Sequence, residues 1–213
     1  MHKEAVVLVH GLWMRGAVMA WLARRLEAAG YASCAPGYHS LGEALDAAAR
    51  RIAAVAKTLP HDAVHLVGHS LGGLVLLRAD QLGLLPQPGR RVLIASPAGA
   101  SAAARALAAR SWSRALVGQC LADWLALPPS ATPAGRDYGL IAGNRPFGMG
   151  SLIARLESPH DGAVALSETK LHGARDHIVL PSSHSGLLLS AAVANETVHF
   201  LRHGRFLPGS RRA

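Results

Sequence analysis

Short apolar runs alternate along the chain with longer stretches in which apolar residues recur every three or four positions. The short runs predict six strands, near residues 5–9, 31–35, 63–68, 91–95, 138–142 and 176–180. These runs are apolar throughout rather than alternating, which is typical of parallel strands that are covered on both faces.

The longer stretches predict helices near residues 17–29, 41–58, 71–82 and 185–202. In the first of them, Leu22, Leu26 and Ala29 share one face, and Gly30 stands where a helix C-cap is expected. Strands that alternate with helices through short connections predict a doubly wound α/β fold.

One segment departs from this alternation. Between the strands predicted at 91–95 and 138–142, residues 98–135 read as two helices with a proline-rich exit. A connection of this length at the carboxyl edge of an α/β sheet is often a cap or lid. Trp112 and Trp124 lie on it, and we expect them to line a substrate pocket, although fastening the cap to the body would suit them equally well.

With 213 residues, half of them apolar, the chain has the size and composition of one domain spanning residues 1–213. No apolar run reaches the roughly 18 residues of a membrane span, and the first apolar stretch does not look like a signal peptide. We therefore expect a cytoplasmic protein. Cys34 and Cys120 are too few for a disulfide framework or a metal knuckle, so we expect buried free thiols.

The formal net charge is +9, which could favour anionic surfaces. The arginines, however, stand singly or in pairs, and aromatic residues are few, so a nucleic-acid surface is not predicted. A weak association with an anionic membrane surface is compatible with this charge. No sequence feature demands an oligomer.

The sequence Gly-His-Ser-Leu-Gly-Gly at residues 68–73 lies between a predicted strand and a predicted helix. A Gly-x-Ser-x-Gly motif in that position predicts a nucleophile elbow, a tight turn that needs small neighbours and presents the serine hydroxyl above the sheet edge. Ser70 is therefore the candidate nucleophile.

A serine hydroxyl needs a base, and the base needs an orienting acid; in elbow enzymes the chain order is serine, acid, histidine. His184 lies in a polar loop after the last predicted strand, where the base is expected. His177 begins that strand, whereas His199 and His203 lie within or at the end of the last helix and face away. His184 is therefore the candidate base.

Asp161 is the candidate acid because its loop follows the strand at 138–142, next to the strand that precedes His184. Asp176 and Asp137 stand at the amino-terminal ends of strands, which is the wrong edge of the sheet, and Asp123 lies in the cap.

Attack on an acyl carbonyl places negative charge on its oxygen, which two backbone N–H groups should face. We expect one from Leu71, directly after the nucleophile, and one from Leu12, where Gly11 allows close approach. Trp13, beside Leu12, is expected to line an apolar pocket. His10 is expected to hold this loop, and His69 to serve for position rather than acid–base chemistry.

Together these stretches resemble the α/β-hydrolase superfamily, specifically small bacterial lipase- or esterase-like members. Val-His-Gly-Leu at 9–12 resembles the lipase oxyanion motif, residues 68–73 the lipase elbow, and the stretches at 161–164, 171–175 and 183–188 the acid and histidine segments. The resemblance implies a minimal α/β-hydrolase fold without the usual antiparallel first pair of strands. It also implies about six parallel strands ordered 2-1-3-4-5-6, flanked by helices, with a helical cap insertion at about 98–135.

The resemblance further implies a serine carboxylic-ester hydrolase that works through a Ser70–Asp161–His184 triad and an acyl-enzyme on esters with an apolar acyl group. Such an enzyme takes a small-molecule ester or lipid substrate and needs no metal or organic cofactor. Two alternatives stay open: an acyltransferase or thioesterase with the same triad, and a fold that serves only for binding.

Overall fold

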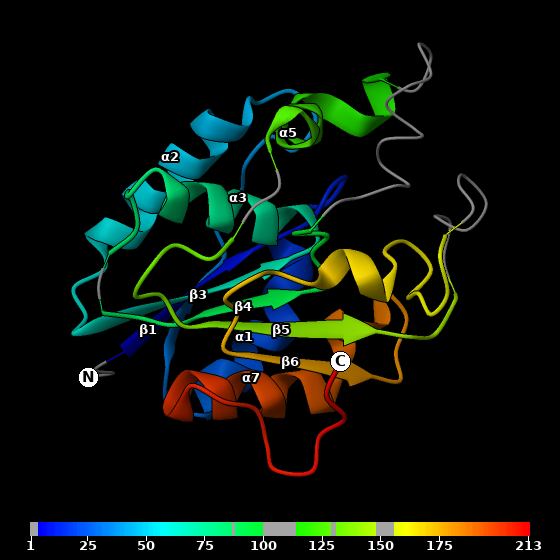
Figure 1. Ribbon diagram of the computed structural model, residues 1–213. Helices are drawn as coiled ribbons and strands as arrows, with labels where there is room; N and C mark the ends of the chain where they lie inside the picture. Colours follow the sequence, from blue (N-terminus) through cyan, green and yellow to red (C-terminus); the bar gives the residue numbers. More distant parts are fainter. Residues whose placement is uncertain (1–3, 87, 100–113, 129–130, 148–155) are drawn as a thin grey trace.

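In the described part of the chain, six parallel strands form one sheet at the centre of the molecule (Figure 1). This computed structural model describes residues 4–86, 88–99, 114–128, 131–147 and 156–213. The strands are β1 (Glu4–Val9), β2 (Ala32–Cys34), β3 (Ala63–His69), β4 (Arg91–Ile94), β5 (Tyr138–Gly143) and β6 (Asp176–Leu180). All six strand predictions are confirmed, and their bounds differ from the predicted ones by only a residue or two.

The strands lie in the order β2-β1-β3-β4-β5-β6, as the resemblance to the α/β hydrolases implied. Val9 at the end of β1 pairs with Gly68 of β3, and His69 pairs with Ile94 at the end of β4. The loops that leave β1, β3 and β4 therefore start side by side at the carboxyl edge of the sheet.

Helices cover both faces of this sheet (Figure 1). One layer holds α2 (Leu45–Thr58), α3 (Leu71–Gln81) and α5 (Arg114–Ala126), and the other holds α1 (Ala20–Ala28) and α7 (Ala191–His203). Short 3-10 turns precede α1 and α7, at Gly16–Met19 (η1) and Gly186–Leu189 (η4), and a third, η3, spans Leu166–Thr169.

Two hydrophobic cores lie on the two faces of the sheet. In β1, Val7 and Val9 belong to the core under α2 and α3, whereas Val6 and Leu8 belong to the core under α1 and α7. Successive strand residues point to opposite faces, so a strand buried on both sides needs apolar residues at every position. This accounts for the continuous apolar runs in the sequence.

The second helix begins at Leu45, four residues later than predicted, because a distant segment binds the preceding loop. The carboxylate of Asp123 accepts a hydrogen bond from the Leu45 amide (Oδ2···N 2.9 Å), and the Gln119 amide donates to the Leu41 carbonyl (2.8 Å). An acidic group at a helix start satisfies a free N–H and suits the helix dipole. Both contacts join residues far apart in sequence.

The last predicted helix, 185–202, is divided into η4 and α7. Ser190 has extended backbone angles between them, and its hydroxyl oxygen accepts a hydrogen bond from the Val193 amide at 3.4 Å. Serine is a common N-cap, so the sequence carried a signal for this boundary. The helix ends at His203, and the next residue, Gly204, has a φ of 70° that suits a glycine C-cap.

Helix α5 bears a break at Gly118, where φ is 73° and ψ is 163°. A Cβ atom on Gly118 would lie 2.6 Å from Cα of Leu41, so α5 and the loop that leads into α2 approach one another at this glycine. Helix α5 belongs to the segment 98–135 in which we predicted a cap. Residues 100–113 and 129–130 of that segment, Trp112 included, lie outside the described residues.

A polar cluster is buried at the amino-terminal edge of the sheet, opposite the end where Ser70 lies. Arg91 donates from Nε and Nη2 to the two carboxylate oxygens of Asp80, at 2.8 and 3.1 Å, and both side chains are fully buried. The Tyr138 hydroxyl donates to Asp80 at 2.7 Å, and Arg136 lies 3.3 Å from the same carboxylate. Burial and the Asp80 charge raise the pKa of Tyr138 well above its usual value, so its hydroxyl stays protonated.

Both cysteines are free thiols, Cys34 half-buried and Cys120 buried. Burial raises the pKa of both thiols, that of Cys120 to about 12. Neither sulfur is therefore a ready thiolate nucleophile. Among the described residues, none of the helices combines the length and the apolar character that crossing a bilayer requires.

Candidate active site

Ser70 occupies a strained turn between β3 and α3. Its backbone has φ 54° and ψ −123°, a conformation that non-glycine residues adopt only where the surrounding structure enforces it. A Cβ atom on Gly68 would lie 2.6 Å from Cα of Gly73, and one on Gly72 would collide with the Val9 carbonyl. The motif's glycines are therefore required by backbone packing around the serine.

Hydrogen bonds hold this turn on the sheet. The Ser70 amide donates to the Ile94 carbonyl at 2.8 Å, and the Gly73 amide donates to the Ser70 carbonyl at 3.0 Å. Leu71 is the first residue of α3, so its N–H has no intrahelical acceptor. That N–H lies directly beside the serine, at the positive end of the helix dipole.

His184 and Asp161 form a hydrogen-bonded pair. His184 Nδ1 lies 2.8 Å from Asp161 Oδ2, and the His184 amide donates to the Asp161 carbonyl at 2.9 Å. The other carboxylate oxygen, Oδ1, accepts from the amides of Ala163 (2.9 Å) and Val164 (2.8 Å). With the carboxylate ionised, Nδ1 of His184 carries the hydrogen and Nε2 is left able to accept a proton.

The charge of Asp161 is stabilised even though the side chain is buried. Burial raises the pKa of this carboxyl, but the hydrogen bond and charge of His184 and the amides of Val164 and Ala163 outweigh it. The net shift of the pKa of Asp161 is downward, so the group stays ionised wherever a histidine can titrate.

His69, the neighbour of Ser70 in the chain, contacts His184. Its Nε2 lies 3.1 Å from the His184 carbonyl oxygen, and the two ring centroids are 4.7 Å apart. Burial, followed by the nearby charge of His184, lowers the pKa of His69 to about 3, so this ring is neutral. A carbonyl can only accept, so Nε2 carries the proton. Through this contact the structure brings the loops of Ser70, His184 and Asp161 together.

The loop after β1 approaches Ser70 from the other side. A Cβ atom on Gly11 would lie 3.1 Å from Cβ of Ser70, so a larger residue there would crowd the serine. The buried ring of His10 bonds the Gly11 carbonyl through Nδ1 (2.9 Å) and stacks on Tyr38 at 4.5 Å between centroids. The Tyr38 hydroxyl donates in turn to the His10 carbonyl at 3.0 Å. These contacts fix the backbone that leads into Leu12.

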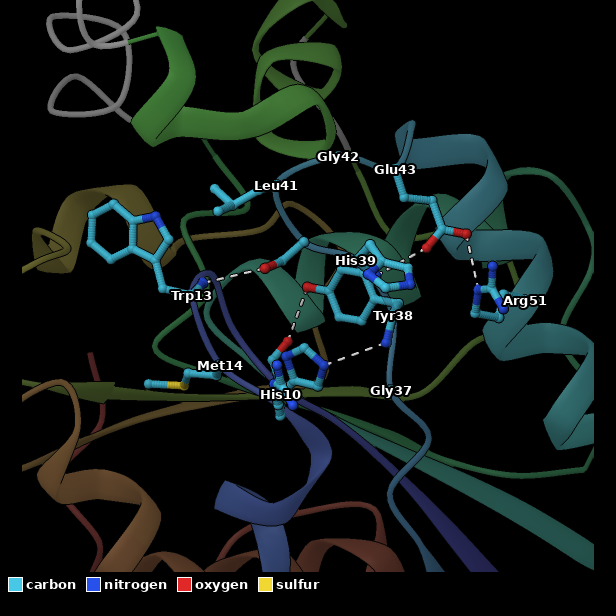
Figure 2. A pocket seen from close by; sticks show the side chains of 12 residues that line it. His10, Trp13, Met14, Gly37, Tyr38, His39, Leu41, Gly42, Glu43 and Arg51 are labelled. Atoms are coloured by element: carbon cyan, nitrogen blue, oxygen red, sulfur yellow. Dashed lines mark hydrogen bonds and ion pairs between the residues drawn. The ribbon is translucent and has the colours of Figure 1, made fainter.

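A pocket of about 870 Å³ opens between this loop and the loop after β2 (Figure 2). Its lining comes from residues 10–15 and 37–43 together with Arg51 of α2. Trp13 lines it and is 52% exposed, and its backbone N–H donates to the Ser40 hydroxyl at 3.2 Å. Trp124 is only 6% exposed and packs in the hydrophobic core, so the structure does not place it among the lining residues.

The pattern of the sequence did not point to the loop at 37–43 as a pocket wall. Its residues form no catalytic motif, and Tyr38 looks like a core aromatic. The place of the loop in the fold could have predicted the pocket. The loop follows a short strand at the carboxyl edge of a parallel sheet, which is where such sheets bind ligands.

The other acidic candidates have structural partners. Asp137 pairs with Arg90 and Arg175, at 3.4 and 2.8 Å. Asp176 accepts from the Phe206 amide at 2.8 Å. The third, Asp123, accepts from the amide at the start of α2, as described above.

The other candidate histidines lie away from Ser70. His177 in β6 lies 3.1 Å from the Thr169 hydroxyl, and burial lowers its pKa to about 4. His199 and His203 contact one another on α7, with ring centroids 4.5 Å apart. Within the described ranges, no group of three or more His, Cys, Asp or Glu side chains could hold a metal ion.

The buried neutral histidines predict that the fold loses stability in acid. Burial lowers the pKa of His10, His69 and His177 from the ordinary 6.5, to about 3 for His69 and about 4 for His177. Between those values and 6.5 the unfolded chain binds more protons than the folded one, so stability falls as the pH falls. Each such histidine contributes up to about 1.4 kcal/mol per pH unit.

Urea midpoints measured at pH 7.5, 6 and 5 should therefore decrease steadily. The variant His177→Gln should show a smaller decrease than the wild type, because it removes one of the titrating groups. Equal midpoints at all three values would contradict the prediction.

Known proteins resemble this chain in fold more clearly than in sequence. None of the curated proteins matches the sequence significantly. Solved structures do match. A Bacillus licheniformis lipase, BlEst2 in its mature form, aligns over 95% of this chain and 92% of its own, with 18% identity and a TM-score of 0.73.

Two further structures are similar. A pyrethroid hydrolase from Sphingobium faniae JZ-2 aligns over 94% of this chain and 98% of its own, with 15% identity and a TM-score of 0.61. The NocB thioesterase domain, in a covalent complex with a fluorophosphonate nocardicin G analog, aligns over 94% of each chain, with 19% identity and a TM-score of 0.60. At these identities the likeness concerns the fold. The sequence profile of the alpha/beta hydrolase family matches residues 6–196. Since this match spans most of the sequence, the chain belongs to the alpha/beta hydrolase family.

Proposed function

We propose that this protein is a serine carboxylic-ester hydrolase that works through an acyl-enzyme. One observation carries the proposal: Ser70 stands in a strained turn, and its neighbour His69 holds the loop in which His184 is hydrogen-bonded to Asp161. Strain of this kind is retained where function requires it. A histidine bonded to a buried carboxylate beside a serine is the arrangement that activates a hydroxyl.

In the proposed reaction, Ser70 Oγ attacks the acyl carbonyl carbon while its proton passes to Nε2 of His184. Asp161 accepts the hydrogen bond from Nδ1 and stabilises the imidazolium that forms. The amides of Leu12 and Leu71 are proposed to hold the negative oxygen of the tetrahedral intermediate. His184 then protonates the departing alcohol, which leaves the acyl group on Ser70 Oγ. A water molecule, deprotonated by the same histidine, attacks the acyl carbon, and the acid leaves as His184 returns the proton to Ser70 Oγ.

The names of the similar structures support this reaction class. They include a lipase, a pyrethroid hydrolase and a thioesterase domain bound covalently to a fluorophosphonate. In each case the name describes the other protein, at 15–19% identity. For this chain we propose a small-molecule ester or lipid as substrate. Because the net charge is +9, we add weak, salt-sensitive binding to anionic membranes.

We also propose that residues 1–213 act as one catalytic unit in which the segment 98–135 covers the site. The proposed cover would include helix α5, the one helix of this segment among the described residues. Trp112 lies outside the described residues, so its role as a pocket residue stays a prediction. Trp124 is proposed to fasten α5 to the body, in line with its burial.

The test is hydrolysis of p-nitrophenyl esters from acetyl to long acyl, combined with a fluorophosphonate label. We expect turnover of at least part of the series, and a phosphonate adduct that peptide mass spectrometry maps to Ser70. Activity without an adduct on Ser70 would overturn the assignment of the nucleophile. The absence of both activity and adduct would overturn the proposed function.

An added alcohol separates hydrolysis from acyl transfer. With methanol or a longer alcohol present, a hydrolase should release mainly the free acid, whereas an acyltransferase should release mainly the new ester. A preference for thioesters over matched oxygen esters would identify a thioesterase instead.

His69 is expected to act as a positioning residue in this reaction. His69→Leu removes the N–H donor to the His184 carbonyl, and a misplacement of about 1 Å at a catalytic group can cost about 100-fold in rate. We expect kcat to fall about 10- to 100-fold with little change in KM. His69→Gln can place an N–H near the same point and should recover part of the loss. If the two variants behave alike, the hydrogen bond has no role in positioning.

A further inference from the structure

The pocket between residues 10–15 and 37–43 has an apolar, aromatic side. The Trp13 side chain, 52% exposed, and the Leu41 side chain, 42% exposed, lie toward one end of it, with Met14 nearby (Figure 2). Exposed apolar groups that line a pocket gain from contact with an apolar ligand. The stacked rings of His10 and Tyr38 also line the pocket.

Two arginines, Arg15 and Arg51, also line the pocket. Arg51 donates from Nε to Glu43 Oε1 at 2.9 Å, and Glu43 Oε2 accepts from the His39 amide at 3.1 Å, so both oxygens of Glu43 are engaged (Figure 2). Within the described part of the chain, the terminal Nη1 and Nη2 groups of Arg51 have no acceptor, and neither has the side chain of Arg15. The pocket thus offers two sets of guanidinium donors and one carboxylate that is already satisfied.

The position of this pocket relative to the reacting atoms decides which half of an ester it would receive. His184 comes from the loop after β6, on one side of β3, and the pocket lies after β1 and β2, on the other side. Since His184 must protonate the departing alcohol, the alcohol belongs on the β6 side of Ser70. The acyl group then extends past Leu12 toward the pocket.

From these observations we infer that the pocket is an acyl subsite that selects acyl groups ending in a carboxylate, so that the preferred substrates are half-esters of dicarboxylic acids. This inference rests on the proposed ester hydrolysis. The methylene chain would lie against Trp13 and Leu41, and the terminal carboxylate would accept hydrogen bonds from Arg15 or Arg51. Guanidinium groups bind carboxylates through paired, charge-assisted hydrogen bonds, which are stronger than neutral ones.

The test compares substrates that differ only in the terminal group. Mono-p-nitrophenyl esters of adipic and suberic acid are matched in chain length with p-nitrophenyl hexanoate and octanoate. The measured quantity is the ratio of kcat/KM for the carboxylated ester to that for the neutral one, at pH 8. We expect a ratio above 1 for the wild type, falling about tenfold in Arg15→Gln or Arg51→Gln.

Arg50→Gln is the matched control, because Arg50 is an exposed arginine next to Arg51 on α2 that does not line the pocket. It removes the same charge from the same helix and should leave the ratio unchanged. An equal fall in Arg50→Gln would show that the net charge, and not the pocket, selects the acid, and would overturn the inference.

The remaining outcomes separate this inference from the proposed function. If neutral esters are cleaved through Ser70 but the carboxylated esters are not preferred, the ester hydrolase stands and the inference is wrong. If no ester is cleaved, the pocket can still be tested by binding. Ligand-observed NMR then compares the binding of suberate with that of octanoate to the Ser70→Ala protein. Suberate binding that Arg15→Gln weakens would support the subsite, and equal or absent binding of the two acids would overturn it.

Discussion

Ser70→Ala is expected to lower kcat/KM for ester hydrolysis by at least about 10⁴-fold, because removing the nucleophile of a serine triad leaves only the contribution of binding and the oxyanion site. The reaction proposed here makes its first covalent bond to Ser70 Oγ, and alanine offers no replacement atom. The measurement is kcat/KM on the best ester of the series, at equal concentrations of folded protein, with active-site titration of the wild type. Retained activity in the alanine variant would place the nucleophile elsewhere.

Ser70→Gly supplies a matched comparison. It should be equally inactive, yet its free energy of unfolding should exceed that of the alanine variant by about 1 kcal/mol, because residues held in such backbone conformations carry strain that glycine relieves. The backbone angles of 54° and −123° are the source of that strain. Equal stability of the two variants would mean that the turn costs the fold nothing.

Asp80→Ala is expected to be the most destabilising of the changes considered, by about 3–5 kcal/mol, because it leaves a buried guanidinium without its counter-charge. Arg91 is fully buried and loses both of its bonds to the carboxylate, and Tyr138 loses its acceptor. Chemical denaturation at neutral pH measures the loss. The cluster lies at the edge of the sheet opposite Ser70, so the molecules that remain folded should keep their activity.

Two further variants show whether Asp80→Ala loses stability because a buried guanidinium is left unpaired. Asp80→Leu combined with Arg91→Met and Arg136→Met removes all three charges of the cluster and should recover much of the stability, since apolar replacements of buried ion pairs are often neutral or stabilising. Asp46→Ala breaks the partly exposed ion pair with Arg78 and should cost at most about 1 kcal/mol. If the triple variant is as unstable as Asp80→Ala, the loss reflects packing and not an unpaired charge.

The strands of the sheet could be predicted because each can be recognised from its own residues. Runs such as the one at 5–9 are apolar at every position, and in the folded protein both of their faces are covered. The strand order came from the resemblance to a family, not from the runs themselves, because an apolar run does not say which other run it will pair with.

Where the bounds of a helix differ from the prediction, contacts between distant residues are one cause. The start of α2 at Leu45 is set by Asp123, seventy-eight positions further along the chain, and no local pattern at 41–45 records that contact. The break before α7 was different, because Ser190 stands in the sequence as a possible cap. Helical periodicity on both sides of it favoured one continuous helix.

The candidate site was predictable where spacing reflects backbone geometry. Gly68, Ser70 and Gly72 stand at intervals that only a tight turn requires. The order serine, acid, histidine along the chain then narrowed the candidates for the acid and the base to loops at the carboxyl edge of the sheet. The pocket was harder to predict, because Trp13 and Leu41 line one pocket only when two loops after neighbouring strands fold beside each other. Trp124 was expected in the pocket because bulk and apolar character suit a pocket and a core equally.

Helix α5 has a consequence for how this protein could change during evolution. At its break, Gly118 packs closely against the backbone of Leu41. Asp123 on the same helix accepts a hydrogen bond from the amide at the start of α2. A substitution at either position would shift a wall of the pocket without touching a bound molecule. Selection for a new substrate could therefore act on α5, and a mutant library restricted to the pocket lining would not sample those routes.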